Sequence, residues 1–391
     1  MKPDEIKTVQ GIDNFYPLLD GVINTVNQYA AIMTKTADTA VVAPVEEPFD
    51  DSSLPYTIFR SRALRFSFSE YTVPVPKADR NLKKFLDSRE IDLIHVHSPF
   101  FIGEYLMEYG KKKGIPVVAS FHSKYYDDAL NATGNKAIAY LMSQRVARFY
   151  EKADAVFACS EGTGKTLVSY GFKGTYSVMN NGSSLKYPEH PDALILRARE
   201  AFHIEPGKKT ILFVGHLIWH KNLKLILDSF KEFAKARPEY RLLIAGEGYD
   251  EAAIRKYAES LDFPEGQIRF LGKISDRDLL SGVYLLSDLF FFPSVYDNSP
   301  LVVREAASLG LPALLTAGSN AAEAVEHNVS GFTAEETTDG MVRELERIFA
   351  SPGLLKTVGA RARIDVPRSW EEIVSEVREK YAQIIENYQP K

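Results

Sequence analysis

The 391-residue sequence contains a single cysteine, Cys159, and no long apolar run. One cysteine excludes a disulfide framework and a cysteine-rich zinc site, and it fits a reducing compartment. The first residues, MKPDEIKTVQ, lack the apolar core of a signal peptide, and no segment is long enough to cross a bilayer as an apolar helix. These absences predict a cytoplasmic protein and leave peripheral contact with a membrane open.

The sequence also lacks an excess of positive charge. Its 47 lysine and arginine residues and 52 aspartate and glutamate residues give a formal net charge of −5 at pH 7. Without a basic field, we expect no nucleic-acid partner. The chain does have length, and 391 residues exceed what one hydrophobic core usually organises, so we expect two domains.

Short apolar runs alternate with longer helical patterns in both halves of the chain. Near-continuous apolar runs bounded by Gly or Pro are typical of parallel strands that are covered on both faces. They occupy residues 6–12, 39–44, 91–97, 115–121, 154–160 and 175–180, and then 210–215, 241–246, 267–272, 288–293 and 311–317. Segment 50–76 is less regular. Two such series predict two doubly wound α/β domains, and two such domains facing each other would form a cleft at the carboxyl ends of their strands.

A linker is indicated by residues 180–193, NNGSSLKYPEHPDA, which are rich in Gly, Ser and Pro. We therefore place an N-terminal domain at residues 1–186 and a C-terminal domain at residues 187–368. Residues 369–391 predict a long helix that starts with a capping box of Ser369 and Glu372 and carries an apolar stripe. That stripe needs an apolar surface to pack on.

Residues 159–167, CSEGTGKTL, end like a phosphate-binding P-loop. The P-loop pattern requires glycine at the position of Cys159, because that residue makes a tight turn whose N–H groups face phosphate. We interpret the segment instead as a strand-to-helix loop that is capped by Ser160. A P-loop NTPase remains the alternative.

Two acids stand eight positions apart after the expected strand 288–293. Ser299 and Pro300 indicate the start of a helix, with proline near its first turn. The N–H groups at a helix start can receive a phosphate. Asp297 at the mouth of the loop and Glu305 on the helix could hold hydroxyls of a sugar and a ribose.

This loop resembles the Glu-x7-Glu region of retaining family-4 glycosyltransferases, which have the two-domain GT-B fold. Other segments are similar to the family in the same order along nearly the whole chain: YPLLDGV, LIHVHSP, ASFHS, ADAVFACSEGTGKTLVSYG, FVGHLIWHKNL, LIAGEG, FLGKI and GLPALLTAGSNAAEAV. No single motif is specific, but the ordered set is. In this family the GKT segment is no nucleotide site, and the final Trp-Glu-Glu helix resembles the segment that crosses back onto the N-terminal domain.

The resemblance implies a role for each residue of the site. His122 would lie beside the reacting sugar, Asp297 would bind the donor sugar and Glu305 the ribose. Lys221 would offer positive charge to the departing phosphate. The other donor-binding residues implied by the resemblance are Gly21, His216, Gly248, Leu271, Lys273, Asn298, Ser299, Pro300, Leu301 and Val302.

Two departures from the family pattern bear on the activity. Asp297 stands where the family has the first glutamate, and His216 stands where it has an arginine. Histidine replaces only part of the two-pronged grip of arginine on a phosphate. Each residue also has a simpler interpretation: Asp297 could form a turn with Asn298, Glu305 could be an exposed helix carboxylate, and His122 could be a hydrogen-bonded residue at a strand end.

Three other patterns could suggest a metal site. Asp276-Arg277-Asp278 resembles a metal-binding Asp-x-Asp, but we interpret Asp276 as a helix cap. Residues 125–128, YYDD, are interpreted as a plain loop. We expect His95 and His97, which alternate along one strand, to face opposite sides of the sheet and to be poor partners for one metal ion.

The predicted function is retaining transfer of a sugar from a nucleotide diphosphate sugar to an acceptor hydroxyl, without a cofactor or a metal. UDP-glucose is the first choice of donor and GDP-mannose the second, and the acceptor would be a sugar or a lipid, as in glycolipid or polysaccharide biosynthesis. The alternatives are a nucleotide-sugar 2-epimerase of the same fold and a catalytically silent sugar-nucleotide-binding protein.

Two basic segments favour a lipid acceptor at a membrane. Residues 77–89 place Lys77, Arg80 and Lys84 at helical spacing, with Leu82, Phe85 and Leu86 on another side, and residues 60–68 place Arg60, Arg62 and Arg65 beside Phe59, Phe66 and Phe68. Basic amphipathic stretches dock on anionic lipid. A solvated helix face is the alternative interpretation.

Overall fold

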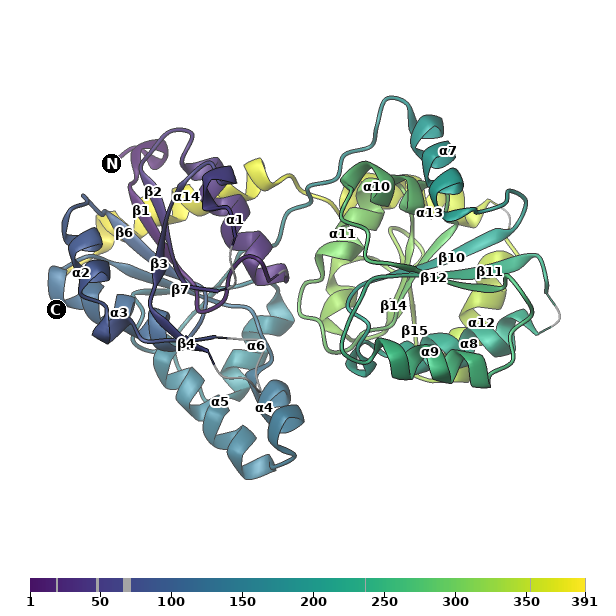
Figure 1. The fold of residues 1–391 in the computed structure, drawn as a ribbon, viewed down its shortest axis with the longest axis horizontal. Helices are drawn as coiled ribbons and strands as arrows, with labels where there is room; N and C mark the ends of the chain where they lie inside the picture. Colours follow the sequence, from purple (N-terminus) through teal and green to yellow (C-terminus); the bar gives the residue numbers. More distant parts are fainter. Residues whose placement is uncertain (19, 47–48, 66–71, 236, 352, 391) are drawn as a thin grey trace. The chain divides into compact units, whose positions relative to one another are not determined.

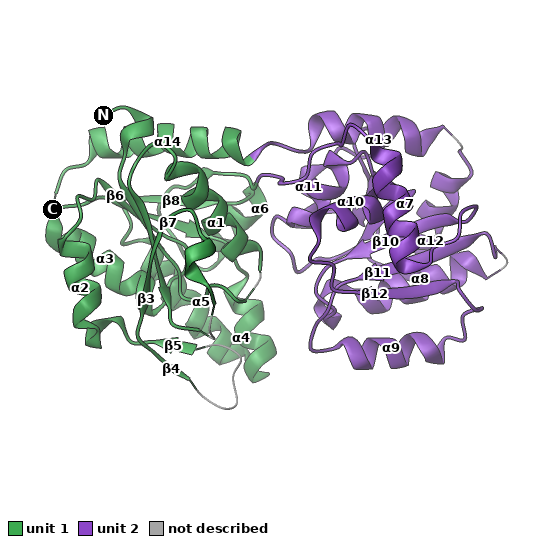
Figure 2. Ribbon diagram, turned by 45° about the horizontal axis from the view of Figure 1, so that its top comes forward, with its two compact units in different colours: residues 1–181, 370–391 green, residues 182–369 purple. Residues whose placement is uncertain are grey.

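The computed structural model describes residues 1–18, 20–46, 49–65, 72–235, 237–351 and 353–390. The chain divides into two compact units: unit 1 comprises Met1–Asn181 and Trp370–Lys391, and unit 2 comprises Gly182–Ser369 (Figure 2). Each unit is an α/β layer structure around its own parallel sheet, so the expected class of two doubly wound domains is confirmed. The division lies a few residues before the boundary at residue 186 that the linker suggests.

Unit 1 is built on a seven-stranded parallel sheet in the order β3-β2-β1-β6-β7-β8-β9. Its strands are β1 (Thr8–Gly11), β2 (Thr39–Pro44), β3 (Thr57–Ser61), β6 (Leu93–Val96), β7 (Val117–Phe121), β8 (Ala155–Ala158) and β9 (Ser177–Val178). A separate antiparallel pair is formed by β4 (Ala63–Arg65) and β5 (Thr72–Pro74). Strands β3, β4 and β5 fall in the irregular segment for which the sequence predicted no strand.

The helices of unit 1 come from both sides of unit 2 in the sequence. They are α1 (Gly21–Met33), α2 (Arg80–Asp87), α3 (Phe101–Lys113), α4 (Tyr125–Thr133), α5 (Lys136–Tyr150), α6 (Glu161–Ser169) and α14 (Trp370–Asn387), with short 3-10 helices η1 (Pro3–Glu5), η2 (Asp51–Ser53) and η3 (Pro76–Ala78). Residues 125–128, expected in a loop, are the first turn of α4.

Helix α14 (yellow in Figure 1) is fastened to unit 1 by apolar and polar contacts. Its apolar stripe is buried from Trp370 to Tyr381, and the rings of Tyr29 on α1 and Trp370 lie 6.2 Å apart. Arg378 donates to Met33 O at 2.9 Å and pairs with Asp4 at 3.0 Å. The stripe seen in the sequence thus finds the apolar surface that it needs.

Unit 2 is built on a six-stranded parallel sheet in the order β12-β11-β10-β13-β14-β15. Its strands are β10 (Lys209–Val214), β11 (Tyr240–Ala245), β12 (Ile268–Gly272), β13 (Leu289–Phe292), β14 (Ala313–Thr316) and β15 (Phe332–Ala334). The core includes Phe290, Phe291 and Phe292 of β13, all with 0% exposure, so that side chains pack on both faces of this strand.

Helices cover both faces of the unit 2 sheet. The helices are α7 (Pro191–Phe202), α8 (Leu223–Ala234), α9 (Glu251–Ser260), α10 (Arg277–Leu285), α11 (Leu301–Ser308), α12 (Thr338–Phe349) and α13 (Leu354–Asp365), with η4 (Trp219–Lys221) and η5 (Asn320–Ala324). Figure 1 shows α8, α9 and α12 on one side and α7, α10, α11 and α13 on the other. This arrangement leaves the loops at the carboxyl ends of the strands as the place for a ligand.

Candidate functional site

In unit 2 the direction of strand addition reverses between the neighbouring strands β10 and β13. Ligands of open α/β sheets bind beyond the carboxyl ends of the strands at such a switch point. The loop after β10 and the loop after β13 both leave the sheet there. They carry Lys221 and Asp297, the two residues that the sequence predicts for the leaving phosphate and the donor sugar.

Lys221 and Asp297 form an ion pair at this switch point. Lys221 Nζ lies 2.6 Å from Asp297 Oδ1, and the two side chains are 12% and 17% exposed. Ser294 Oγ donates to the other carboxylate oxygen at 2.6 Å, and Lys221 Nζ lies 5.4 Å from the centre of the Phe292 ring. The alternative interpretation of Asp297 as a simple turn residue does not account for this pair.

Glycines let the loops after β10 and β11 lie backbone against backbone. A Cβ on Gly248 would lie 2.5 Å from Leu217 O, and a Cβ on Gly246 would lie 1.9 Å from Gly215 O. Leu217 N donates to Glu247 O at 2.9 Å. Gly248, expected in the base pocket, is therefore required by the packing of these loops whatever they bind.

The end of β12 supplies the other two residues that the resemblance assigns to the base pocket. Leu271 is half-buried. Lys273 Nζ pairs with Glu247 at 2.5 Å, and both side chains are largely exposed, at 45% and 55%. Their contact with a nucleobase stays a prediction.

Glu305 is buried on α11, with 5% exposure, so the interpretation of an exposed helix carboxylate is wrong. Arg277 Nη2 donates to Glu305 Oε1 at 2.8 Å, and the Tyr284 hydroxyl lies 3.4 Å from Oε2. Burial raises the pKa of Tyr284 well above its usual value, so this hydroxyl stays protonated and donates. Sequence reasoning missed Arg277 and Tyr284 because no local motif links α10 to α11.

Helix α11 begins at Leu301, with Pro300 as its N-cap residue. Before it, Asn298 is buried and its Oδ1 accepts from Asn320 Nδ2 at 2.9 Å. Ser299 and Val302 complete the segment around the helix start. The dipole of a helix favours an anion at its N-terminal end. The predicted phosphate-binding residues at this helix start directly follow Asp297, which pairs with Lys221.

Two further predictions concern residues near these loops. His216 is exposed directly after Gly215, so it is accessible from solvent.

Asp276 is the N-cap residue of α10, and its Oδ1 accepts from Leu279 N at 2.9 Å. The capping interpretation of the Asp-x-Asp sequence is confirmed.

In unit 1 the GKT sequence lies inside helix α6. The Ser160 side chain caps this helix by accepting from Thr163 N at 3.1 Å. A Cβ on Gly164 would lie 2.2 Å from the ring of Tyr176. The glycine therefore makes room for a tyrosine, and the capped-helix interpretation is confirmed.

Gly21 is the first residue of α1, which is capped by Asp20. The Asp20 side chain accepts from Ile23 N at 2.7 Å. A Cβ on Gly21 would meet no described atom within 4 Å, so packing within unit 1 does not require glycine there. The contact of Gly21 with donor phosphates stays a prediction, and Leu19 of the same motif lies outside the described residues.

His95, His97 and His122 form a cluster at the carboxyl edge of the unit 1 sheet. The rings of His95 and His97 lie 4.0 Å apart. The expectation that they face opposite sides is wrong, because side chains alternate along a strand and residues two apart share a face. His97 Nδ1 lies 3.2 Å from His122 Nε2, and His97 Nε2 lies 2.9 Å from Gln10 Oε1.

Burial keeps these three histidines neutral. It lowers the pKa of His95 and of His97 well below the usual value of 6.5, and it lowers the pKa of His122 to about 4. Electrostatic repulsion from the neighbouring histidines, when they are protonated, lowers the pKa of His95 and His97 further. Among the described residues, no group of three or more His, Cys, Asp or Glu residues is arranged to hold a metal ion.

The basic helix α2 does not present the amphipathic face that the sequence suggested. Leu82 and Leu86 are fully buried in the core of unit 1, and Phe85 packs on Phe59 with ring centres 4.9 Å apart. Lys77, just before this helix, pairs with Glu108 at 2.9 Å. The apolar side of α2 is therefore committed to its own domain.

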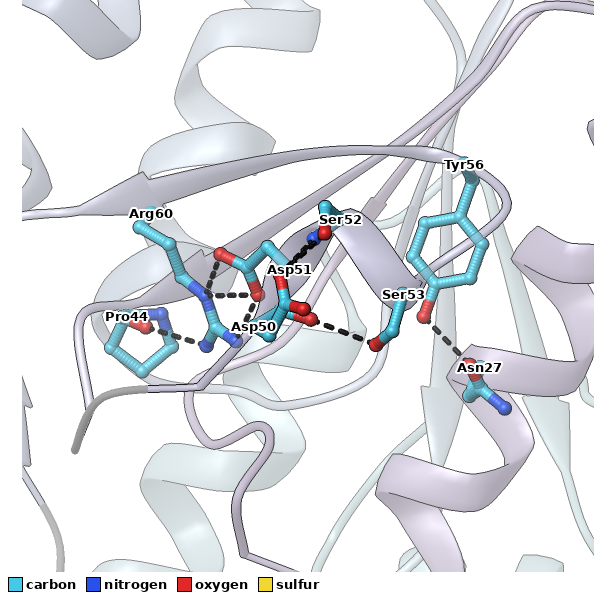
Figure 3. Close-up of polar contacts among 8 residues, drawn as sticks. All are labelled: Asn27, Pro44, Asp50, Asp51, Ser52, Ser53, Tyr56 and Arg60. Atoms are coloured by element: carbon cyan, nitrogen blue, oxygen red, sulfur yellow. Dashed lines mark hydrogen bonds and ion pairs between the residues drawn. The ribbon is translucent and has the colours of Figure 1, made fainter.

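In the second basic segment, residues 60–68, Arg60 is also bound within its own domain. Arg60 Nη2 lies 2.7 Å from Asp51 Oδ1, and Arg60 Nη1 donates to Pro44 O at 3.1 Å (Figure 3). Phe66 and Phe68 lie outside the described residues. No helix within the described ranges is long and apolar enough to span a membrane.

Comparison with known proteins adds two family matches. Residues 196–365 match the family described as Glycosyl transferases group 1, and residues 29–186 match the family described as Glycosyltransferase Family 4. The two matches follow one another along the chain and together span most of it.

Two distant relatives align with most of the chain. An alpha-monoglucosyldiacylglycerol synthase of Streptococcus pneumoniae is 22% identical over 88% of this chain and 78% of its own length. A GDP-mannose-dependent alpha-mannosyltransferase of Corynebacterium glutamicum is 20% identical over 95% of this chain and 88% of its own length. The solved structure of Anabaena HepE in complex with UDP and glucose has a TM-score of 0.76 at 16% identity, and covers 97% of this chain and 100% of that chain.

Proposed function

Because the chain belongs to the family-4 glycosyltransferases and has the GT-B fold, we propose that it moves a hexose from a nucleotide diphosphate sugar to an acceptor hydroxyl with retention of the α configuration and without a metal. The observation that carries the proposal is the ion pair of Lys221 and Asp297 at the switch point of unit 2. UDP-glucose is the first donor to test and GDP-mannose the second, in view of the relatives.

The proposed step breaks the bond between the anomeric carbon and the diphosphate. The new bond to the acceptor oxygen forms on the same face of the sugar, and the acceptor proton passes to the departing phosphate. Negative charge grows on that phosphate, and Lys221 and the N-terminus of α11 offer positive potential for it. A preorganised cation of this kind lowers the barrier because it need not reorient during the reaction.

The ion pair suggests how the donor is accommodated. A diphosphate competes with Asp297 for the ammonium group of Lys221. Asp297 then keeps its hydrogen bond from Ser294 and turns its other oxygen to a hydroxyl of the donor sugar. This exchange leaves Lys221 paired throughout, which avoids an isolated charge in a site where its side chain is 12% exposed.

Glu305 is suited to the ribose for a similar reason. A carboxylate has about four acceptor positions on its two oxygens. Arg277 and Tyr284 each use one of them and hold the group in a fixed orientation. The remaining positions can accept the two ribose hydroxyls, as the family resemblance implies.

A lipid acceptor is our further proposal. One relative is named as a synthase of a glucosylated diacylglycerol, and the chain aligns with most of that protein. Acceptors of this kind would bring the enzyme to a membrane surface, where the protein would bind peripherally.

The first experiment is a thermal-shift panel of UDP, GDP, ADP and their glucose and mannose derivatives. A ligand that binds the folded chain raises the melting temperature by mass action. The donor selected in this way is then incubated with diacylglycerol vesicles, with and without EDTA, and the anomer of the product is read by proton NMR. We expect an α-linked product in both conditions.

Three outcomes would overturn parts of the proposal. Donor conversion without any acceptor would favour the 2-epimerase. Tight donor binding without transfer to any lipid or sugar acceptor would favour the silent binding protein. A β-linked product, or a requirement for metal, would contradict the retaining, metal-independent reaction.

A further inference from the structure

Three neutral histidines in contact must share hydrogen-bond donors and acceptors, and Gln10 on β1 determines how they do so. Gln10 is fully buried, and its amide nitrogen lies 3.8 Å from the sulfur of Met33 and 3.3 Å from Thr8 Oγ1. A thioether sulfur can only accept a hydrogen bond. The amide NH2 of Gln10 therefore faces Met33, and its oxygen faces His97.

The orientation of Gln10 fixes the proton of His97. The Gln10 oxygen can only accept, so His97 Nε2, at 2.9 Å, carries the ring proton. A neutral imidazole has one N–H, so His97 Nδ1 is an acceptor. It lies 3.2 Å from His122 Nε2, which must then be the donor.

We propose that Gln10 and His97 are positioning residues that hold His122 in its Nε2–H form, so that His122 Nδ1 accepts a hydrogen bond from a substrate hydroxyl. His97 is 1% exposed and Gln10 is 0% exposed, whereas His122 is only partly buried. Of these three hydrogen-bonded residues, His122 is therefore the one that a substrate can reach. The identity of the hydroxyl depends on the proposed function, but the tautomer does not.

Burial supports this assignment. The lowered pKa values of His97 and His122 keep both rings neutral at pH 7, and only a neutral ring has a tautomer to fix. The aromatic groups that face His97 are also uncharged: Tyr29 from α1 lies 6.0 Å away between ring centres, and burial raises the pKa of Tyr29. His95, on the same strand, is likewise neutral.

A second branch of the cluster provides a matched control. The Tyr381 hydroxyl of α14 lies 2.5 Å from His95 Nδ1, and His95 Nε2 lies 2.7 Å from Ser120 Oγ. Burial raises the pKa of Tyr381 well above its usual value, so this hydroxyl donates to His95. The Tyr381 hydroxyl also bonds to the Gln10 side chain, so Ser120, which bonds to His95 Nε2, serves as the matched control.

The test is nitrogen NMR of the full-length protein with 15N-labelled histidine. Ring nitrogen shifts and two-bond couplings distinguish a protonated Nε2 from a protonated Nδ1. The chain has eight histidines, so His95, His97 and His122 are assigned by the loss of their signals in single glutamine variants. We expect all three to be Nε2–H in the wild type at pH 7, and a His122 with a protonated Nδ1 would overturn the proposal.

Two variants separate positioning from general disruption of the core. Gln10→Met keeps the length of the side chain but replaces the amide oxygen by a sulfur that accepts only weakly. We therefore expect His97 to invert and donate from Nδ1, and His122 to shift to its Nδ1–H form. Ser120→Ala removes the buried hydroxyl that bonds to His95 Nε2, and it should change the signals of His95 while leaving the tautomer of His122 unchanged. Unchanged His122 signals in Gln10→Met, or an equal change in both variants, would contradict the proposal.

Activity gives a separate measurement. In Gln10→Met we expect sugar transfer to fall about tenfold, the effect of one lost hydrogen bond to substrate, with the dissociation constant of the nucleoside diphosphate within about twofold of wild type because Gln10 does not touch it. If no nucleotide sugar binds the wild type, the proposed function fails while the NMR result still decides the tautomer. If Gln10→Met does not fold, the wild-type spectrum alone decides it.

Discussion

The two sheets of the chain reverse their strand order in the same way, between β1 and β6 in unit 1 and between β10 and β13 in unit 2. The loops at these two switch points carry different chemistry. Unit 2 holds opposite charges in contact: Lys221 against Asp297 at the switch point, and Arg277 of α10 against Glu305 of α11. Unit 1 holds a buried cluster of neutral rings around His97.

The buried acid Asp13 of unit 1 differs in the same way from Asp297 and Glu305 of unit 2, which are paired with cations. Asp13, after β1, is bonded to Ser98 Oγ at 2.5 Å and to Ile102 N at 2.7 Å, but no cation is among these partners. Burial raises its pKa to about 6, and the hydrogen bonds only partly offset that rise. A shared strand order therefore fixes where a site lies, whereas the side chains on the loops decide whether it handles charge.

The largest expected effect comes from removing the charge at the unit 2 switch point. Lys221→Ala leaves Asp297 without its cation and the departing phosphate without its ammonium group. We expect kcat for sugar transfer to fall by about 10²–10³, as for the loss of one preorganised group that stabilises the transition state. Steady-state kinetics with the donor identified by thermal shift measures it.

Lys224→Ala is the matched control for that prediction. Lys224 lies on the first turn of α8, is 62% exposed and pairs with Asp228 at 2.5 Å. It should keep nearly full activity, because exposed ion pairs contribute little. Equal losses in the two variants would remove the special role of Lys221.

Glu305→Gln should weaken donor binding by about 1.5–3 kcal/mol, the range for hydrogen bonds to charged groups. The neutral amide also weakens the contact with Arg277, so a smaller loss of folding stability should accompany it. Isothermal titration of the nucleoside diphosphate measures the affinity. Glu346→Gln, at an exposed carboxylate that pairs with Arg237 at 2.9 Å, should bind the donor like the wild type.

Acid should destabilise the fold through the histidines of unit 1. The folded pKa of His122, about 4, is below the usual 6.5, so the unfolded chain binds a proton first as the pH falls. The contribution to stability is therefore complete above pH 6.5 and is lost below it, by about 1.4 kcal/mol per pH unit for each such histidine. Urea unfolding at pH 7.5, 6.5 and 5.5 measures this loss.

Asp13 acts in the opposite direction. Its folded pKa, about 6, is above the usual 3.8, so the fold gains from its protonation as the pH falls through 6. Because three histidines oppose one such aspartate, we expect a net loss of folding stability as the pH falls. His95→Gln should reduce the acid dependence, whereas His190→Gln, at an exposed histidine of unit 2, should leave it as in the wild type. A steeper profile in His95→Gln would contradict the assignment of neutral histidines.

The smallest effect is expected at His216. His216→Arg restores a permanent charge at the position where the family has arginine, and we expect it to tighten nucleoside diphosphate binding by about 0.5–1 kcal/mol, since the site is exposed and salt screens it. His190→Arg adds the same charge elsewhere on unit 2. Similar gains in both variants would mean that only net charge matters.

The fold could be predicted where burial makes a strand apolar throughout. Residues 39–44, TAVVAP, are buried at every position, and β2 has the bounds that the sequence indicated. Strand β3 at the edge of its sheet has mixed exposure along TIFRS, and β15 has only three residues, so neither gives a continuous apolar signal. Edge strands are covered on fewer sides, which weakens the pattern that marks them.

The candidate site could be predicted as residue types but not as contacts. Lys221 and Asp297 stood out by motif, yet they are 76 positions apart and their pairing follows from β10 lying beside β13. Tyr381 meets His95 across 286 positions, so no local pattern could connect them. The shared face of His95 and His97 was predictable from strand geometry and was misjudged.

Helix α14 has a consequence for how the protein is made. A ribosome finishes residues 1–181 first, but these residues lack the helix that covers Tyr29 and supplies Tyr381, and α14 is encoded after all of unit 2. At about 5–20 residues per second, unit 2 takes roughly 10–40 s to synthesise. During that interval the side chains of the first-made domain that α14 covers stay exposed, while residues 182–369 already contain every strand and helix of their own domain. The later-made domain is thus the first that can complete its fold, and the nascent N-terminal segment is the part that a chaperone would need to shield.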